Sequence, residues 1–191
     1  MASIKGTKTE KNLLASFAGE SQARNRYTYF ARVAEKEGYP QIAAIFLETA
    51  DNERLHAKRM FSFLEGGAVE ITASYPAGVV GDTAANLAAA ADGEKEEYTQ
   101  LYPGFAATAK QEGFNEVSAM YAMISKAEAW HEQRYRQLLD NVKNGTVFKK
   151  AAPVKWKCQK CGYIHEGVEP PKKCPACLHD RTHFEVLAEN W

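Results

Sequence analysis

The sequence feature that most constrains the fold is a pair of Glu-x-x-His motifs that lie 75 residues apart. The motifs are Glu53–His56 and Glu128–His131. A spacing of three residues is close to one helical turn, so both side chains of a motif leave the same face of a helix. One such motif arises easily by chance and would suit a solvated polar face. Two of them, set in matching surroundings, predict two helices that meet around a shared site.

The surroundings do match, because the chain contains an internal repeat. FARVAEKEGYPQIAAIF (residues 30–46) aligns with FAATAKQEGFNEVSAMY (residues 105–121) at the same offset of 75. Glu20 falls one residue short of this offset, on Glu94, and a glycine precedes both. A duplicated helix pair that forms one bundle with a pseudo-twofold axis explains this pattern.

Apolar residues at helical spacing predict four long helices. They cover residues 7–37, the segment from Pro40 to Glu65–Gly67, the segment from Asp82 or Thr83 to Gly113, and the segment that ends at Asn144–Gly145. Thr9 is a candidate cap for the first helix, and Pro103 predicts a kink in the third. Residues 68–81 are rich in turn-forming and β-branched types, and we expect them to form a long crossover between the two helix pairs.

Four acids and two histidines form a candidate metal site inside this bundle: Glu20, Glu53, Glu94 and Glu128 with His56 and His131. Both Glu-x-x-His pairs lie on the apolar stripes of their helices, and ionisable groups are seldom buried unless they are paired or bind a metal. Carboxylates bridge and neutralise two cations, and imidazole nitrogen suits iron. This ligand set is the one found in ferritin-like di-iron and di-manganese proteins. We therefore expect a mainly α, ferritin-like four-helix bundle over residues 1–148.

Glu97 breaks the symmetry of the repeat. It lies three residues after Glu94, on the same face of the helix, whereas the corresponding position in the first half is Ala23. Glu97 is therefore a seventh candidate ligand, and a solvated acid is the alternative. Tyr27, Tyr102 and Arg24 are candidates for hydrogen-bonding to the ligands, although a tyrosine on such a stripe also serves simply as core.

Residues 149–191 predict a second, small metal-binding module. All four cysteines of the chain lie there as two Cys-x-x-Cys pairs: Cys158, Cys161, Cys174 and Cys177. This spacing is typical of a tetrahedral thiolate site, and a module this small needs the metal to hold it folded. Spacing leaves zinc and iron open, and the module alone favours zinc. Trp156, Tyr163, Phe184 and Trp191 are expected to pack around the site, and His165, His179 and His183 to lie at the surface.

Composition excludes several classes of partner. Lys plus Arg and Asp plus Glu are 24 each, so no basic surplus marks a nucleic-acid-binding protein. The N-terminal stretch has no apolar signal-peptide core, and no run of apolar residues is long enough to span a membrane. Four cysteines kept as metal ligands favour a reducing compartment, so we expect a cytoplasmic protein.

The order of these motifs resembles the rubrerythrin family of non-haem iron proteins. The resemblance covers essentially the whole chain: GESQARNRY around Glu20, ETADNERLHAKR, the Gly93–Tyr98 segment, Glu128-x-x-His131, Cys-x-x-Cys-Gly-Tyr, Cys-Pro-x-Cys and a terminal Trp. It implies a non-haem di-iron centre that reduces hydrogen peroxide to water. It also implies a rubredoxin-like β module that holds iron on four cysteines, which reverses the preference for zinc.

The resemblance further assigns roles to the ligands. Glu53 and Glu128 would bridge the irons, Glu20 would be terminal on one iron, and Glu94 and His131 would be terminal on the other. Glu97 would bind the first iron when it is oxidised, and His56 would replace Glu97 when it is reduced. Electrons would come from a rubredoxin or an NAD(P)H-dependent flavoprotein, and would cross between subunits of a head-to-tail homodimer.

Two other functions remain open on the sequence. Ferritin-like bundles also oxidise Fe(II) for iron storage. A storage protein, however, has no need of a fused cysteine module that accepts electrons. A metal-stabilised interaction protein without turnover is the other alternative.

Overall fold

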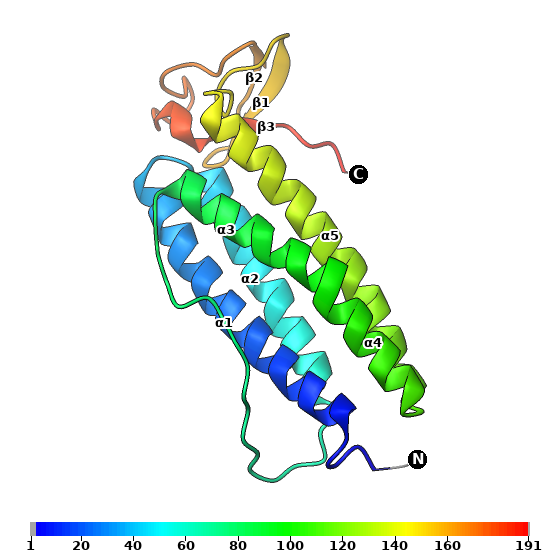
Figure 1. Cartoon of the computed structure of the whole chain (residues 1–191). Coiled ribbons are helices and arrows are strands. Elements are labelled where there is room, and N and C mark those ends of the chain that lie inside the picture. The colour runs from blue at the N-terminus through cyan, green and yellow to red at the C-terminus, as the bar shows by residue number, and fades with distance from the viewer. Residues whose placement is uncertain (1–2, 191) are drawn as a thin grey trace.

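The computed structural model describes residues 3–190 and shows a bundle of long helices with a small strand-containing module at one end (Figure 1). The helical elements are α1 (Lys8–Lys36), α2 (Pro40–Phe61), α3 (Thr83–Glu96), the π-helix η1 (Glu97–Leu101), α4 (Tyr102–Gln111) and α5 (Asn115–Lys143). α1 packs against α2, while α3 and α4 pack against α5. The two halves of the sequence repeat thus form two helix pairs, as predicted.

The ends of the helices follow local capping chemistry. Thr7, not the predicted Thr9, caps α1, since its side chain accepts the N–H of Glu10. Thr9 instead hydrogen-bonds to the carboxylate of Glu112 at 2.7 Å. Asp82 caps α3 as predicted and accepts the N–H of Ala85.

Helix α2 ends at Phe61, earlier than the predicted Glu65–Gly67 stretch. Glu65 leaves the helical path and accepts the backbone N–H of Ile4 at 2.9 Å. A tertiary contact between the N-terminal segment and the end of α2 therefore overrides the helical pattern.

The predicted irregularity near Pro103 takes the form of η1. This π-helix lies between α3 and α4, and it begins at Glu97. π-helical turns occur mostly as short insertions in α-helices, often at functional sites, and they change the direction of the side chains that follow.

A long connection without helix or strand joins α2 to α3. In Figure 1 it runs along the outside of the bundle, from the end of α2 back to the opposite end, where α3 starts. α3 consequently runs in the same direction as α2. Among residues 3–190, no helix is both long and apolar enough to cross a membrane.

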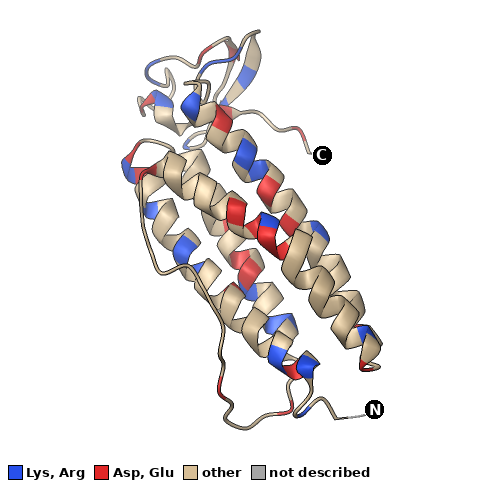
Figure 2. Ribbon diagram, viewed as in Figure 1, with Lys and Arg blue, Asp and Glu red and all other residues tan. Residues whose placement is uncertain are grey.

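The core of the bundle consists of two apolar clusters. One contains Tyr27, Phe46 and Tyr135, and the other contains Tyr102 and Tyr121. Acidic residues gather about midway along the helices of the bundle (Figure 2).

The C-terminal module is a small antiparallel sheet. Its strands are β1 (Val154–Cys158), β2 (Ile164–Gly167) and β3 (Phe184–Val186), in the order β2-β1-β3, with the 3-10 turn η2 (Arg181–His183) before β3. Trp156 and Phe184 are buried beside the cysteines, with Tyr163 packed against them, as predicted. The predicted role of Trp191 lies outside the described residues.

The module contacts the bundle near the turn between α1 and α2. A Cβ atom at Gly38, in this turn, would lie 3.3 Å from Cγ2 of Thr182 in the module. The ring of Phe148, in the segment that leads into the module, stacks on Tyr39 with 6.3 Å between centroids. The division of the chain between residues 148 and 149 stays a prediction, and it falls in the segment between the end of α5 and the start of β1.

Candidate metal centres

The six predicted bundle ligands come together in the structure. Four helices supply them: Glu20 from α1, Glu53 and His56 from α2, Glu94 from α3, and Glu128 and His131 from α5. They form two groups in which the ligand atoms lie within 4.8 Å of one another, and both groups contain Glu53 and Glu128. His56 completes one group with Glu20, and His131 completes the other with Glu94. The cluster therefore provides two adjacent metal sites that share two carboxylates.

The separations between atoms show that the shared carboxylates lie between the two imidazoles. Nδ1 of His56 lies 2.9 Å from Glu53 and 3.0 Å from Glu128. Nδ1 of His131 lies 2.9 Å from Glu128 and 3.3 Å from Glu53. Each shared carboxylate thus directs one oxygen toward each half of the cluster, as a bridging ligand must.

Several buried ligand atoms make no well-aligned hydrogen bond, even where an imidazole nitrogen lies only 2.9 Å from a carboxylate oxygen. They include Oε2 of Glu20, Oε1 of Glu53, Oε2 of Glu94, both carboxylate oxygens of Glu128 and Nδ1 of His131. An unsatisfied buried polar atom costs about 1–3 kcal/mol, and more if it is charged. Cations bound by these atoms would remove that cost, so the residues present fit a two-metal centre.

The pKa values of the ligands also indicate that the cluster favours bound positive charge. Burial raises the pKa of Glu20 well above its ordinary value, and the nearby Glu97 raises it further. Burial and the charge of Glu53 raise the pKa of Glu94 to about 8. Burial disfavours protonation of His131, but contacts with Glu128 and Glu53 prevail and raise its pKa to about 12. Without metal, bound protons neutralise this cluster.

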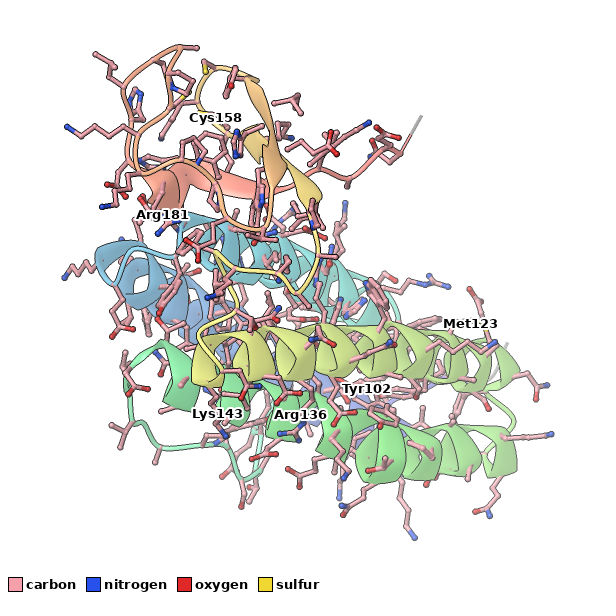
Figure 3. All side chains as sticks on the ribbon, turned by 90° about the horizontal axis from the view of Figure 1, so that it is seen from above. Tyr102, Met123, Arg136, Lys143, Cys158 and Arg181 are labelled. Atoms are coloured by element: carbon pink, nitrogen blue, oxygen red, sulfur yellow. The ribbon has the colours of Figure 1, made fainter. Side chains whose placement is uncertain are left out.

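Two tyrosines hold the two carboxylates that each belong to only one of the ligand groups, Glu94 and Glu20. Tyr27 donates its hydroxyl hydrogen bond to Oε1 of Glu94 at 2.6 Å, and Tyr102 donates to Oε1 of Glu20 at 2.5 Å. The two tyrosines are themselves 75 residues apart, so the repeat that links the ligands also links these donors. Figure 3 shows Tyr102 among the helices. Arg24 is exposed, so its predicted contact with the cluster is wrong.

Glu97 lies beside the cluster rather than in it. It belongs to neither group of ligands and is only partly exposed. It lines a cavity of about 290 Å³ together with Tyr27 and Tyr102. Burial, and then the charge of Glu94, raises the pKa of Glu97 well above its ordinary value. Tyr75 of the crossover also lines this cavity. Tyr75 was not predicted to lie at the site, because a segment without periodicity gives no indication of what it packs against.

The four cysteines converge as predicted. Their Sγ atoms all lie within 4.8 Å of one another, and none is in a disulfide. Sγ of Cys158 is 3.8 Å from that of Cys177, and Sγ of Cys161 is 3.6 Å from that of Cys174. Cys158 lies in the module at the end of the bundle (Figure 3), and Cys161 is exposed at its surface. This arrangement is a four-thiolate metal site with one edge open to partners.

His179 contacts this site. It is exposed, as predicted, but its Nδ1 lies 3.3 Å from Sγ of Cys177. His165 and His183 are only partly exposed.

Comparisons with known proteins agree with both centres. The rubrerythrin family model matches residues 11–139, and the model of the rubrerythrin rubredoxin-like domain matches residues 156–185. The chain is 58% identical to a rubrerythrin of Porphyromonas gingivalis, over 99% of this chain and 94% of that protein. It is 54% identical to a rubrerythrin of Nitratidesulfovibrio vulgaris over the whole of both chains.

Solved structures support the fold. The structure of mixed-valence nigerythrin aligns with a TM-score of 0.62 and 29% identity, over 96% of this chain and 91% of that one. Reduced symerythrin from Cyanophora paradoxa aligns with a TM-score of 0.64 at 24% identity, over 75% of this chain and 89% of that one, and shows the fold alone.

The cofactors follow from the two ligand sets and these matches. The carboxylate and histidine cluster is a di-iron site in a ferritin-like bundle, and the four cysteines form a rubredoxin-like iron site. The chain therefore belongs to the rubrerythrin family of iron-binding oxidoreductases.

Proposed function

We propose that this protein is a peroxidase that reduces hydrogen peroxide to water. The observation that carries the proposal is that one chain combines a two-metal carboxylate cluster, which has a cavity at its side, with a four-thiolate site that has an exposed edge. Bound as Fe(II), the metal pair would supply the two electrons that cleave the O–O bond. The residues of the chain hold the pair, admit the peroxide and move protons.

The ligands keep the roles that the resemblance implies. Glu53 and Glu128 would hold both metals, Glu20 would bind one of them, and Glu94 with His131 would bind the other. His56 lies in the first ligand group, and Glu97 lies outside both groups. The proposed roles predict this arrangement for the reduced protein, in which His56 rather than Glu97 would bind the iron. A neutral nitrogen suits Fe(II), whereas an anionic oxygen suits Fe(III).

Glu97 is the best-placed proton carrier. Burial, and then the charge of Glu94, raises its pKa well above its ordinary value and so favours its protonated form, and it lies at the wall between cavity and cluster. A proton delivered there would convert one peroxide oxygen to water, and the emptied carboxylate would then be free to bind the oxidised site.

The cysteine module would return electrons across a subunit interface. Within one chain, α5 alone extends twelve residues beyond His131, which is about 18 Å at 1.5 Å per residue, before the module begins. A head-to-tail homodimer would place the module of one subunit near the cluster of the other. Leu55 of α2 and Trp130 of α5 are 50% and 57% exposed, which provides apolar surface for such a contact.

The external donor would be a rubredoxin or an NAD(P)H-dependent flavoprotein that docks at the exposed cysteine edge. Four thiolates held for a metal need a reducing compartment, so the proposal includes a cytoplasmic location.

Peroxide consumption by the iron-loaded protein tests the proposal. We expect about three irons per chain, two in the bundle and one on the cysteines. With NADH and a matching reductase, hydrogen peroxide should be consumed continuously, and Cys158→Ser with Cys161→Ser should stop this consumption. If Fe(II) and oxygen are consumed instead and an iron mineral accumulates, the protein is a ferroxidase. If zinc fills the cysteine site and no turnover occurs, it is an interaction protein.

A further inference from the structure

The cavity beside the di-iron cluster is larger than hydrogen peroxide needs. Its volume is about 290 Å³. A water molecule in the liquid takes up about 30 Å³, and hydrogen peroxide is only two oxygens long. The cavity therefore has room for a substrate with an organic group.

One wall of the cavity belongs to the proposed catalytic site, and the others combine apolar side chains with the polar Gln22, Arg26 and Glu96. Tyr27, Glu97 and Tyr102 form the inner wall, and Tyr27 and Tyr102 are the donors to Glu94 and Glu20. Small or apolar side chains line much of the rest: Ala15, Ala73, Pro76, Leu101 and Phe105. An apolar cavity of about 150 Å³ is known to hold benzene, so this lining suits a hydrocarbon group of similar size.

The crossover segment closes the cavity on the outside. The hydroxyl of Tyr75 donates to the carbonyl of Ala15 at 2.6 Å, which ties the segment to α1. A Cβ atom at Gly19 would lie 3.5 Å from the Tyr75 ring, so the ring lies directly over the helix at a position without a side chain. An added Cβ at this distance would make ordinary van der Waals contact with the ring, so Tyr75 packs closely on α1.

We propose that this cavity receives the organic group of small alkyl hydroperoxides and presents their peroxide end to Glu97, so that the protein reduces these compounds as well as hydrogen peroxide. The inference rests on the proposed peroxidase function. The O–O bond breaks, and ROOH takes up two electrons and two protons to give ROH and water. The two electrons come from the reduced iron pair, which the NAD(P)H-dependent donor refills through the cysteine module. The alcohol leaves by the same cavity.

Binding of an unreactive product tests the cavity itself. The probe is 2-phenyl-2-propanol, the alcohol formed from cumene hydroperoxide, titrated into the full-length iron-loaded protein by calorimetry. Ala73→Leu fills the cavity from the crossover, and Ala77→Leu makes the same change on the same exposed segment outside the cavity. Ala73→Leu should weaken binding about tenfold or more, equivalent to about 1.4 kcal/mol, and Ala77→Leu should leave it within a factor of about two. Absence of binding, or equal effects of the two variants, overturns the proposal.

Turnover of two peroxides separates this proposal from the function on which it rests. Wild-type protein should consume both cumene hydroperoxide and hydrogen peroxide. Ala73→Leu should raise KM for cumene hydroperoxide several-fold more than KM for hydrogen peroxide, because only the organic group needs the space that the leucine fills, and Ala77→Leu should change neither. Consumption of hydrogen peroxide alone would overturn the alkyl hydroperoxide activity and leave the peroxidase intact. If neither peroxide is consumed, both proposals fail.

Discussion

At the scale of single residues, the di-iron cluster is a problem of charge balance. Its four carboxylates carry four negative charges when ionised, which match two divalent cations if both histidines are neutral. Two trivalent cations carry two more positive charges, and Glu97 is the acid within reach that can offset part of them. On the proposed ligand exchange, this charge balance accounts for a seventh ligand that is a carboxylate, and for the asymmetry between Glu97 and Ala23.

Replacing His56 tests its role as a ligand of the reduced state. His56→Ala should lower peroxide turnover by at least about tenfold, because a ligand of the Fe(II) form is lost. The oxidised centre should still assemble with two bundle irons, since Glu97 supplies the oxidised ligand. Iron content and the absorption spectrum of the oxidised protein measure this. His131→Ala is the control and should lose iron in both states. If His56→Ala also fails to assemble the oxidised centre, ligand exchange is wrong.

Removing one tyrosine hydroxyl tests the support of the terminal carboxylates. Tyr102→Phe removes the donor to Glu20 and leaves that carboxylate less well oriented, so the affinity for iron should fall by about 10–100-fold. Tyr121→Phe is a matched control, because the Tyr121 hydroxyl contacts Ser16 at 3.0 Å rather than a ligand. Iron retention during competition with a chelator compares the two. Equal retention in both variants would show that the hydroxyl of Tyr102 does not orient the ligand.

At the scale of elements, the sequence predicts what depends on periodicity and misses what depends on tertiary contacts. The apolar stripes predict all four long helices, and the offset of 75 places the six ligands. The cap of α1 moves to Thr7, because Glu112 of the opposite helix pair takes the Thr9 hydroxyl. The packing of Tyr75 over Gly19 has no sequence pattern at all.

The position of Glu97 shows the same limit in one element. Helical spacing correctly places it near Glu94, but the spacing does not predict that a π-helix begins at Glu97. One wider turn changes the direction of every side chain that follows, and no local motif in the sequence specifies such a turn.

The cysteine module offers a test at the level of an element. Cys158→Ser with Cys161→Ser should abolish NADH-driven turnover and remove one iron per chain, because the thiolate site loses two ligands. The bundle should keep its two irons and still react once with peroxide after chemical reduction. Rapid-mixing spectroscopy measures that single reaction. Loss of the single reaction would mean that the module is needed for the bundle to fold, not for electron transfer.

At the scale of the whole molecule, metal loading should reverse the dependence of stability on pH. In the metal-free protein the folded-state pKa is raised for Glu94, from 4.5 to about 8, and for His56, from 6.5 to about 10. Burial is the main cause for Glu94. For His56 burial acts in the opposite direction, and contacts with Glu128 and Glu53 outweigh it. The folded chain then holds more protons than the unfolded chain, so its stability falls as pH rises from about 5 to 9.

Iron binding removes those protons, so the loaded protein should gain stability over the same range. Thermal unfolding of both forms at about pH 6 and about pH 9 measures the two slopes. Glu128, whose pKa is lowered because contacts with His131 and His56 outweigh its burial, acts in the opposite sense, and only below its ordinary pKa of 4.5. Parallel slopes for the two forms would contradict the assignment of these groups as metal ligands.

The charges of the two parts of the chain favour a head-to-tail dimer. Residues 149–191 carry eight Lys and Arg against five Asp and Glu, whereas residues 1–148 carry sixteen against nineteen. The chain is neutral overall, yet its small module is positive and its bundle is negative. Opposite charges steer the module of one subunit toward the bundle of another, although charge alone fixes neither the contact nor the affinity.

Mixing two inactive variants tests whether electrons cross between subunits. One variant lacks the cysteine site through Cys158→Ser, and the other lacks the di-iron site through Glu53→Ala. Each homodimer should be inactive in NADH-driven peroxide reduction. A heterodimer, formed by unfolding and refolding the two together with iron, contains one intact module and one intact cluster on different chains. Transfer between subunits restores turnover in that heterodimer, whereas transfer within a chain leaves it inactive. Activity in the mixture therefore distinguishes the two routes directly, and refolded wild-type protein gives the rate against which it is measured.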